Sequence, residues 1–252
     1  MDCIILAGGF ARRLLPLTEN TPKPLLPVGG RPILSYIFDG LRGLPGLGRA
    51  YLTTNRRFSE HFSAFLAAEG AGLDCELFIE DADREGQKPG SVGALANLLA
   101  RARPGGDCLV IGGDNLFGFR LGDFVARQRE LGSSLVALYD VGSRERASLY
   151  GIARLGPEGR LLELLEKPAD PPSTLASTAC YVFTAGVMAS LPEFIAEGNP
   201  PDAAGHFVAW ACKRFPFYGY TFSGLWYDIG SKEVYAEADE QMWTLRGGRR
   251  DR

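Results

Sequence analysis

Short, mostly apolar runs alternate with segments of helical spacing through the first half of the chain. The apolar runs predict buried strands at residues 3–6, 50–53, 75–79 and 108–111. Apolar residues that recur three and four positions apart predict helices at residues 32–41, 58–68 and 92–102. This alternation favours a three-layer, Rossmann-like α/β fold, with a mixed, mostly parallel central sheet and helices on both faces.

The second half of the chain has a less regular pattern. It predicts strands at residues 134–139, 150–155, 161–165, 179–183 and 219–222, and helices at residues 204–213 and 231–242. No proline- or serine-rich linker divides the sequence. We therefore expect one domain over residues 1–243, made of a first part at 1–135 and a second part at 136–243, and then a polar tail at 244–252.

The composition is that of an ordinary globular protein. The chain has 252 residues, of which 46% are hydrophobic and 23% charged, and its net charge is −3. A slightly acidic chain without a long basic run is not expected to bind nucleic acid. The five cysteines form no C-x-x-C pair, which is typical of buried thiols in a reducing compartment. Because neither a leader nor a membrane-spanning run is predicted, we expect a cytoplasmic protein.

A glycine turn with three cations follows the first predicted strand. Gly8 and Gly9 have no Cβ, so backbone N–H groups there can approach an anion closely. Arg12, Arg13 and Lys23 add positive charge, and four prolines between positions 16 and 27 stiffen the segment. A solvated basic loop is the alternative interpretation, but a stiff loop better suits a site that holds a polyphosphate in place.

These residues resemble a known signature. The segments Leu6–Leu14, Pro22–Val28 and Gly30–Leu34 are similar to that of sugar-1-phosphate nucleotidyltransferases, in the short, glucose-1-phosphate thymidylyltransferase-like form without a C-terminal β-helix. Ala11 stands where that family usually has glycine, and Arg12 where it has threonine. The resemblance implies the family's nucleotidyltransferase fold, a nucleotide-binding part at 1–135 and a sugar-phosphate-binding part at 136–243.

Two isolated aspartates are candidate metal ligands. Asp114 follows a predicted strand in a Gly-Gly-Asp-Asn turn, and Asp228 lies among bulky apolar residues in Trp-Tyr-Asp-Ile-Gly. A carboxylate among apolar neighbours is costly unless it is paired or bound to a metal, and Mg²⁺ commonly takes one or two protein carboxylates. A turn or helix-capping role is the alternative for Asp114. The resemblance implies that both aspartates bind the catalytic Mg²⁺.

The resemblance also assigns residues to the two substrates. It implies that the sugar phosphate contacts Tyr150, Gly151, Glu166, Lys167 and Thr178. Ala179 stands where the family usually has glycine after this threonine. It implies that the nucleotide contacts Leu6, Ala7, Gly8, Gly9, Glu80, Gly90 and Ser91. Since an ionised carboxylate only accepts hydrogen bonds, Glu80 suits the N1–H and N2–H₂ groups of guanine better than O4 of thymine.

The resulting functional hypothesis is a Mg²⁺-dependent enzyme that joins a nucleoside triphosphate to a sugar 1-phosphate and releases pyrophosphate. Its expected catalytic residues are Arg13, Lys23, Asp114 and Lys167. The resemblance favours dTTP or UTP with a hexose 1-phosphate, with GTP or CTP as alternatives, and a homo-oligomer is possible. Two other functions stay open: a non-catalytic regulatory relative, and a metal-dependent glycosyltransferase that uses the D-x-D segment Asp81–Asp83.

Overall fold

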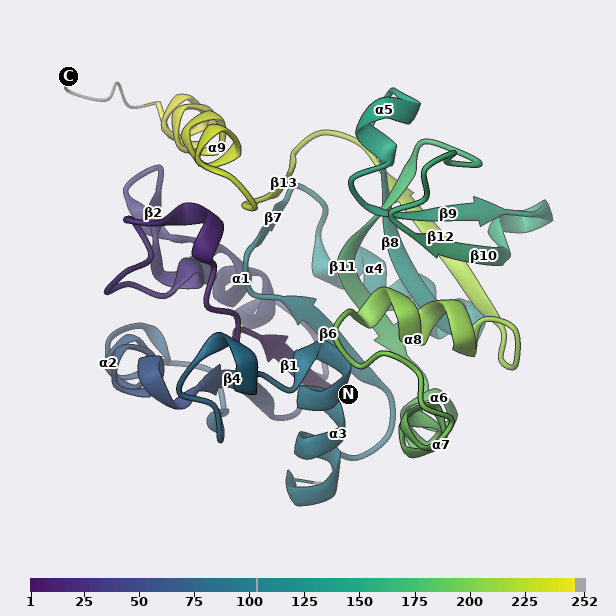
Figure 1. Ribbon diagram of the computed structural model, residues 1–252, viewed down its shortest axis with the longest axis horizontal. Coiled ribbons are helices and arrows are strands. Elements are labelled where there is room, and N and C mark those ends of the chain that lie inside the picture. The colour runs from purple at the N-terminus through teal and green to yellow at the C-terminus, as the bar shows by residue number, and fades with distance from the viewer. Residues whose placement is uncertain (103, 248–252) are drawn as a thin grey trace.

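The computed structural model describes residues 1–102 and 104–247, and within them nine strands form one large sheet (Figure 1). Its first half is parallel throughout. The strands lie side by side in the order β6 (Cys108–Gly112), β1 (Asp2–Leu6), β4 (Ala50–Asn55) and β5 (Cys75–Glu80). Their carboxyl ends therefore meet at one edge of the sheet, where loops of α/β proteins commonly bind ligands.

One reversed strand joins this half to the rest of the sheet. Strand β11 (Leu175–Phe183) is antiparallel to β6 on one side and to β8 (Ser134–Asp140) on the other. Strand β12 (Phe217–Phe222) then pairs parallel to β8. The hairpin of β9 (Gly151–Leu155) and β10 (Leu161–Glu166) contacts the start of β11. The expected mixed, mostly parallel sheet is confirmed.

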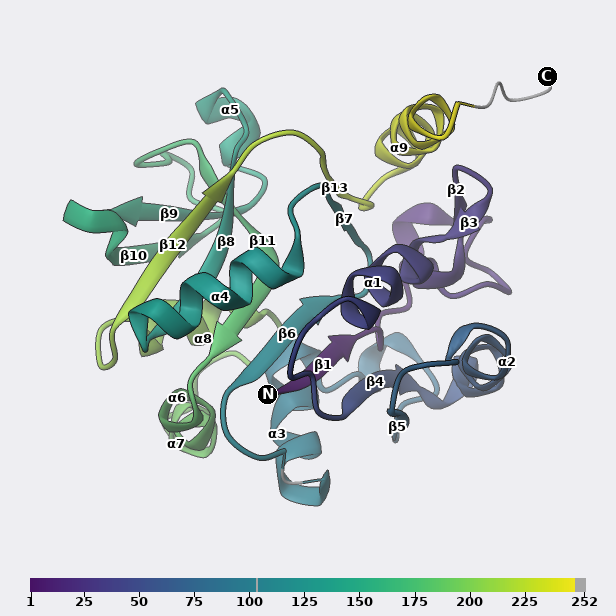
Figure 2. The ribbon, with the colours of Figure 1, turned by 180° about the vertical axis from the view of Figure 1, so that it is seen from behind.

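Helices cover both faces of the sheet, which confirms the three layers. One face carries α3 (Gly90–Ala102), α6 (Ala185–Ala189), α7 (Leu191–Ala196) and α8 (Ala204–Ala211) (Figure 1). The other face carries α1 (Ile33–Arg42), α2 (Ser59–Glu69) and α4 (Leu121–Leu131) (Figure 2). A short helix, α5 (Arg144–Ala147), precedes the β9–β10 hairpin.

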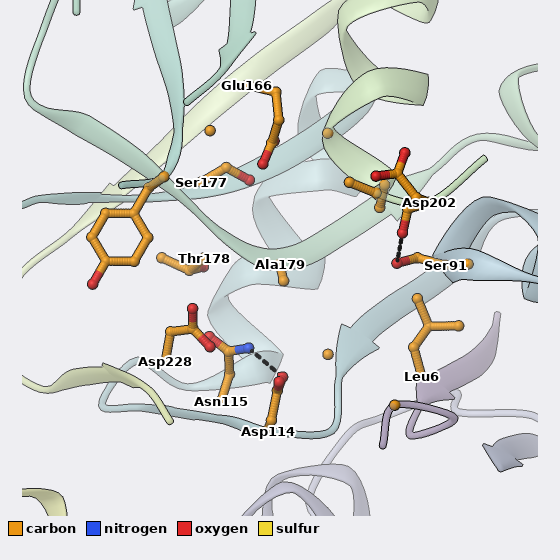
Figure 3. Close-up of a pocket in the computed structure, with 18 of the residues that line it drawn as sticks. Leu6, Ser91, Asp114, Asn115, Glu166, Ser177, Thr178, Ala179, Asp202 and Asp228 are labelled. Atoms are coloured by element: carbon orange, nitrogen blue, oxygen red, sulfur yellow. Dashed lines mark hydrogen bonds between the residues drawn. The ribbon is translucent and has the colours of Figure 1, made fainter. Parts of the chain in front are cut away.

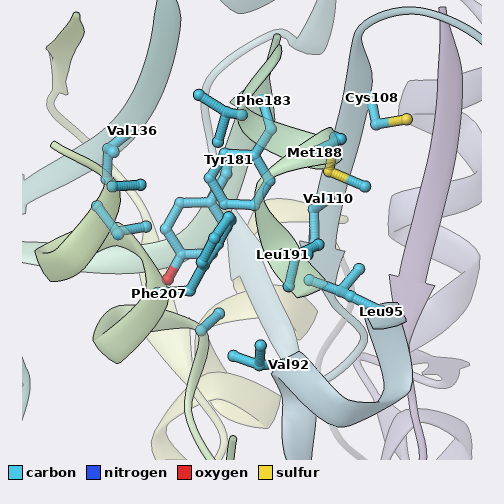
Figure 4. Close-up of a cluster of buried hydrophobic side chains, with 14 of the residues drawn as sticks. Val92, Leu95, Cys108, Val110, Val136, Tyr181, Phe183, Met188, Leu191 and Phe207 are labelled. Carbon is cyan, nitrogen blue, oxygen red and sulfur yellow. The ribbon is translucent and has the colours of Figure 1, made fainter. Parts of the chain in front are cut away.

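Side chains alternate along the strands, so that one strand contributes to two hydrophobic cores, one on each face of the sheet. In β1, Ile4 faces the helices α3, α7 and α8, whereas Cys3 and Ile5 face α1, α2 and α4. Successive side chains of a strand point to opposite faces, so one strand can serve both cores. Figure 4 shows the first core, where Tyr181 and Phe183 of β11 stack at a centroid distance of 5.2 Å. All five cysteines are free thiols, and Cys75 alone among them is only half-buried.

The last described helix packs back on the first loop. Helix α9 (Lys232–Leu245) contacts the small hairpin of β2 (Pro27–Val28) and β3 (Arg31–Pro32), and the Gly29 N–H donates to the Asp239 carboxylate at 2.8 Å. The Tyr235 hydroxyl donates to the Pro27 carbonyl at 2.7 Å. A two-stranded ribbon of β7 (Asn115–Phe117) and β13 (Trp226–Asp228) lies beside it, with Asp228 opposite Asn115.

Several features differ from the sequence expectations: the short helices α5, α6 and α7 and the hairpin of β2 and β3 were not predicted. Helix α4 was not predicted, although it buries Leu121, Phe124 and Val125. Strands β7 and β13 are additional elements that bring two distant motifs together. Helix α9 continues to Leu245, so the start of the expected tail is helical, and residues 248–252 of that tail lie outside the described residues. Among the described residues, each helix is too short or too polar to span a membrane.

Candidate active site

A cleft of about 390 Å³ opens at the carboxyl ends of the parallel strands, between the two halves of the sheet (Figure 3). The structure brings most of the sequence-predicted residues to it. Those that line the cleft are Leu6, Gly8, Gly9, Arg13, Glu80, Gly90, Ser91, Asp114, Tyr150, Gly151, Glu166, Lys167, Thr178 and Asp228. Two predicted residues do not line it. Ala7 packs in the core, and Lys23 reaches the site from behind through Asp114.

The loop after β1 approaches the end of β5 closely at a glycine. A Cβ on Gly8 would lie 2.7 and 3.0 Å from the two carboxylate oxygens of Glu80, so a larger residue would collide with them. The Asn55 side-chain amide donates to the Gly8 carbonyl at 3.1 Å, and the Ala7 N–H donates to the Thr53 carbonyl at 3.1 Å. These bonds hold the loop against strand β4 at the floor of the cleft.

A left-handed residue directs Arg13 into the cleft. Ala11 has φ 47° and ψ 43°, a conformation that glycine adopts more easily, and its carbonyl accepts bonds from the Leu14 N–H at 3.0 Å and the Thr18 hydroxyl at 2.9 Å. A single 3₁₀ turn follows, in which Leu14 is buried. Arg13 lines the cleft and its neighbour Arg12 does not.

Left-handed backbone recurs at the cleft. Four non-glycine residues in the described part of the chain have positive φ, and three of them belong to segments that form the cleft: Ala11, Lys167 and Ala179. Both alanines that stand in place of a family glycine adopt the conformation that a glycine there would favour. Such residues cost about 1–3 kcal/mol each, and they concentrate at functional sites.

Oppositely charged groups gather at one end of the cleft. The Lys23 ammonium forms an ion pair with the Asp114 carboxylate, which also accepts a bond from the Asn115 amide at 3.0 Å. The Trp226 indole N–H donates in turn to the side-chain oxygen (Oδ1) of Asn115 at 3.0 Å, so the β7–β13 ribbon fixes the orientation of the Asn115 amide. Burial alone would lower the pKa of Lys23, but the charges of Asp114 and Asp228 raise it, so Lys23 stays protonated.

The pKa of Asp228, the second aspartate at this end, is raised by burial and in part by its neighbour Asp114. Burial, and then the negative charge of Asp114, raises the pKa of Asp228 to about 6, although Lys23, Lys167 and Arg13 oppose this. Two carboxylates that repel each other at a partly hydrated cleft fit a hard divalent cation, which would relieve that repulsion. No cluster of three or more acidic, histidine or cysteine ligands exists in the described part of the chain. A cation here would therefore need further oxygen ligands from a substrate and water.

Two glycines make room around Glu166 at the opposite end. Glu166 ends β10, and Cβ atoms on Gly151 and Gly205 would lie 3.0 and 2.5 Å from its Oε2. The next residue, Lys167, has φ 47°, and its N–H donates to the Tyr150 carbonyl at 3.0 Å. Both side chains line the cleft, where a carboxylate can accept bonds from hydroxyl groups and an ammonium can bind a phosphate.

Two of the predicted ligand-binding residues are already bonded within the protein. The Thr178 hydroxyl donates to the Ala137 carbonyl at 3.1 Å. The Ser91 N–H and hydroxyl donate to the Asp202 carbonyl at 3.0 and 3.1 Å (Figure 3). Gly90 is required by the same contact, because a Cβ there would lie 2.4 Å from the Pro201 carbonyl oxygen. The first N–H groups of α3 are thus already bonded to the segment that precedes α8.

The cleft also contains residues that sequence reasoning did not select: Thr53, Lys88, Ser177, Tyr181 and Asp202. Only the strand alternation around 175–183 could have indicated Ser177 and Tyr181 as neighbours on one face, and the Ser177 hydroxyl does bond to the Tyr181 hydroxyl at 3.2 Å. In contrast, the D-x-D residues lie outside the cleft. Asp81 and Asp83 are exposed and pair with Arg56.

Comparison with known proteins gives consistent matches. A profile of the nucleotidyl transferase family matches residues 2–244. UTP–glucose-1-phosphate uridylyltransferase AglF of Haloferax volcanii is 34% identical over 187 residues, which are 74% of this chain and 73% of that protein. The bifunctional protein GlmU of Methanococcus aeolicus is 31% identical over 91% of this chain, which spans 51% of its length. A structure from Bacillus anthracis is described as a glucose-1-phosphate thymidylyltransferase in complex with sucrose. It matches this chain with a TM-score of 0.83 at 25% identity, and the match covers 96% of this chain and 95% of the Bacillus anthracis chain.

Proposed function

The chain belongs to the nucleotidyl transferase family, and on that premise we propose that it joins a nucleoside triphosphate to a sugar 1-phosphate. The observation that carries this proposal is one continuous cleft with a cationic glycine loop at one end and the pair Glu166–Lys167 at the other. In the reaction, an oxygen of the sugar phosphate attacks the α-phosphorus. The bond from that phosphorus to the bridging oxygen breaks, and pyrophosphate leaves with the electron pair.

The protein's own contribution is positioning and charge neutralisation. The nucleophile is already an anion, so the reaction needs no general base. Arg13 would bind the triphosphate, Lys167 would hold the sugar phosphate, and Lys23 would hold Asp114 in place through their ion pair. Fixed charges in a partly dry cleft stabilise the charge that develops on the transferring phosphoryl group.

The two aspartates would hold the metal ion. Asp114 and Asp228 come from the β6–β7 turn and from β13, and the pairing of β7 with β13 brings them together. Their oxygen donors suit Mg²⁺, which supplies further charge neutralisation on the phosphates when it is bound. The observation that supports a cation here is that the pairing of Asp228 with Asn115 places both carboxylates on the cleft, and the raised pKa of Asp228 is consistent with it.

The sequence resemblance favours dTTP or UTP with a hexose 1-phosphate, and GTP or CTP are the alternatives. The Glu166 carboxylate, which packs against Gly151 and Gly205 and lines the cleft, supports a ligand rich in hydroxyl groups. Two of the three reported relatives carry names that refer to glucose 1-phosphate, and this sugar is therefore the first one to test.

The two alternative functions have less support. A glycosyltransferase that uses Asp81–Asp83 is disfavoured because those residues pair with Arg56 outside the cleft. A non-catalytic regulatory relative would not need Arg13, Lys23, Asp114, Lys167 and Asp228 together, yet four of them line the cleft and Lys23 pairs with Asp114 beside it.

The test is pyrophosphate release in the presence of Mg²⁺ over a matrix of nucleoside triphosphates and sugar 1-phosphates. We expect release that requires both substrates and that falls sharply in Arg13→Ala. Folded protein that binds nucleotide but releases no pyrophosphate in any combination would contradict the proposal and favour the regulatory alternative.

A further inference from the structure

One acidic side chain in the cleft has no role in the charge balance described above. Glu80 is the last residue of β5, its side chain lines the cleft, and only 4% of its surface is exposed. Its carboxylate lies against Gly8, where a Cβ would come within 2.7 Å of Oε2. The absence of a side chain at Gly8 is therefore what leaves the carboxylate room at the edge of the cleft.

The protein gives this carboxylate little compensation. Of the described residues, none forms an ion pair with Glu80, and the Thr53 hydroxyl is the side-chain donor that bonds to it. The nearby Asn55 amide bonds to the Gly8 carbonyl at 3.1 Å instead. Burial raises the pKa of Glu80 to about 7, which means that the protein surroundings disfavour its charged form. A buried acceptor of this kind is satisfied when a ligand brings donors to it.

Phosphate groups cannot be those donors. Triphosphate oxygens only accept hydrogen bonds, and their negative charge would be repelled by Glu80. The positive charges of Arg13, Lys23 and Lys167 instead act on Asp228, in the part of the cleft that is proposed to hold the phosphates. Glu80 is left for the neutral part of the nucleotide. Leu6 and Ala94 line the same cleft and offer apolar surface to a base.

On the premise of the proposed function, we infer that Glu80 reads the nucleobase and that this base is guanine. The two oxygens of one carboxylate can each accept a hydrogen bond from a pair of adjacent N–H donors. The N1–H and N2–H₂ groups of guanine form such a pair. This inference replaces the pyrimidine preference that the sequence resemblance alone implied.

The other bases match the carboxylate less well. Adenine and cytosine present one amino donor beside an unprotonated ring nitrogen, whose lone pair would face the second oxygen. Uracil and thymine present one ring N–H between two carbonyl oxygens, which would repel the carboxylate in the same way. Sites built to hydrogen-bond a particular group reject analogues that lack it by far more than sites that rely on apolar contact.

The experiment compares pyrophosphate release from GTP, ATP, CTP, UTP and dTTP with a fixed sugar 1-phosphate, in the wild type and in Glu80→Gln. For the wild type we expect kcat/KM for GTP to exceed that for the other triphosphates by about 100-fold or more. The substituted amide offers one donor and one acceptor, so E80Q should lose about 10–100-fold with GTP and gain with UTP and dTTP. Glu60→Gln, an exposed position on α2, is the matched control and should change nothing.

Each outcome of this experiment has a distinct meaning. Release with a pyrimidine triphosphate but not with GTP would overturn the guanine inference and leave the proposed function standing. An equal loss with every triphosphate in E80Q would overturn base reading and indicate contact with the ribose. No release with any triphosphate, for each sugar 1-phosphate of the matrix, would refute the proposed function itself. Because E80Q could alter folding, Glu80→Asp and the thermal unfolding midpoint of each variant are measured alongside, and a folded E80Q with an unchanged GTP preference also contradicts the inference.

Discussion

Two regions of the cleft each contain an acidic side chain with a raised pKa, Glu80 fully buried and Asp228 half-buried, and their surroundings differ. Burial raises the pKa of Asp228 to about 6 and that of Glu80 to about 7. Asp228 shares its surroundings with a second carboxylate and with three cations, Lys23, Lys167 and Arg13. Glu80 has no cation beside it in the described part of the chain and accepts a bond from Thr53.

This difference indicates what each end is prepared to bind. Where cations and carboxylates are mixed, a polyanion and a metal ion can enter and the charges still balance. Where one carboxylate lies alone, a neutral ligand with N–H donors lowers the free energy of the complex, while an anion raises it. The arrangement therefore orients a nucleotide along the cleft, with its phosphates at Arg13 and its base at Glu80.

The largest expected effect comes from the phosphate end. Arg13→Ala removes a charge that lines the cleft, and we expect turnover to fall by about 10²–10³-fold because the transition-state charge loses a fixed partner. Arg12→Ala is the control, since Arg12 is exposed, does not line the cleft and immediately precedes Arg13. Steady-state kinetics and circular dichroism check both. Equal losses in the two variants would remove Arg13 from the mechanism.

A smaller loss is expected when a proposed metal ligand is changed. Asp228→Asn keeps the shape of the side chain but removes its charge, so the Mg²⁺ concentration for half-maximal activity should rise by at least about tenfold. Asp81→Asn should leave that concentration unchanged, because Asp81 pairs with Arg56 outside the cleft. The reverse pattern, with Asp81 sensitive and Asp228 not, would favour the D-x-D alternative.

The raised pKa of Glu80 should make the free energy of unfolding depend on pH. The pKa of Glu80 is higher in the folded protein than in the unfolded chain, so its ionisation destabilises the fold as pH rises from about 4.5 to about 7. We expect Glu80→Gln to raise the free energy of unfolding at pH 8 by on the order of 1–3 kcal/mol, and to have little effect at pH 4.5. Denaturant titrations at both pH values measure this. A variant less stable than wild type at pH 8 would show that the carboxylate is well satisfied.

The smallest effect concerns the turn that directs Arg13. Ala11→Gly should relieve the left-handed strain and raise the free energy of unfolding by up to about 1 kcal/mol. The control is Ala64→Gly, at an exposed position within α2, which should lower the free energy of unfolding by about 1 kcal/mol. Equal destabilisation in both would mean that the conformation of Ala11 carries no strain. Chemical denaturation resolves differences of this size.

Much of the fold could be predicted because its signals are local. The parallel strands of the first half and the glycine turn follow from apolar runs and glycine chemistry within short windows. Helix α4 was missed because its apolar residues Leu121, Phe124 and Val125 are few and separated by charges. Helix α4 is stabilised by packing against the sheet, and a short stretch of sequence carries no information on that packing.

The site was predictable as a set of residues but not as an arrangement. Motif resemblance located Lys23, Asp114 and Asp228 separately, whereas the ion pair and the strand pairing that unite them link positions far apart in the chain. The bonds from Ser91 to the Asp202 carbonyl and the approach of Gly8 to Glu80 are also long-range contacts. The division into parts at 1–135 and 136–243 stays a prediction.

The most direct test of the account is a competition experiment. Wild-type protein is incubated with Mg²⁺, equal concentrations of all five nucleoside triphosphates and a mixture of sugar 1-phosphates, and the products are identified by mass spectrometry. The account predicts that a guanosine diphosphate sugar and pyrophosphate accumulate in equal amounts. Absence of every nucleoside diphosphate sugar, from folded protein, would contradict the account.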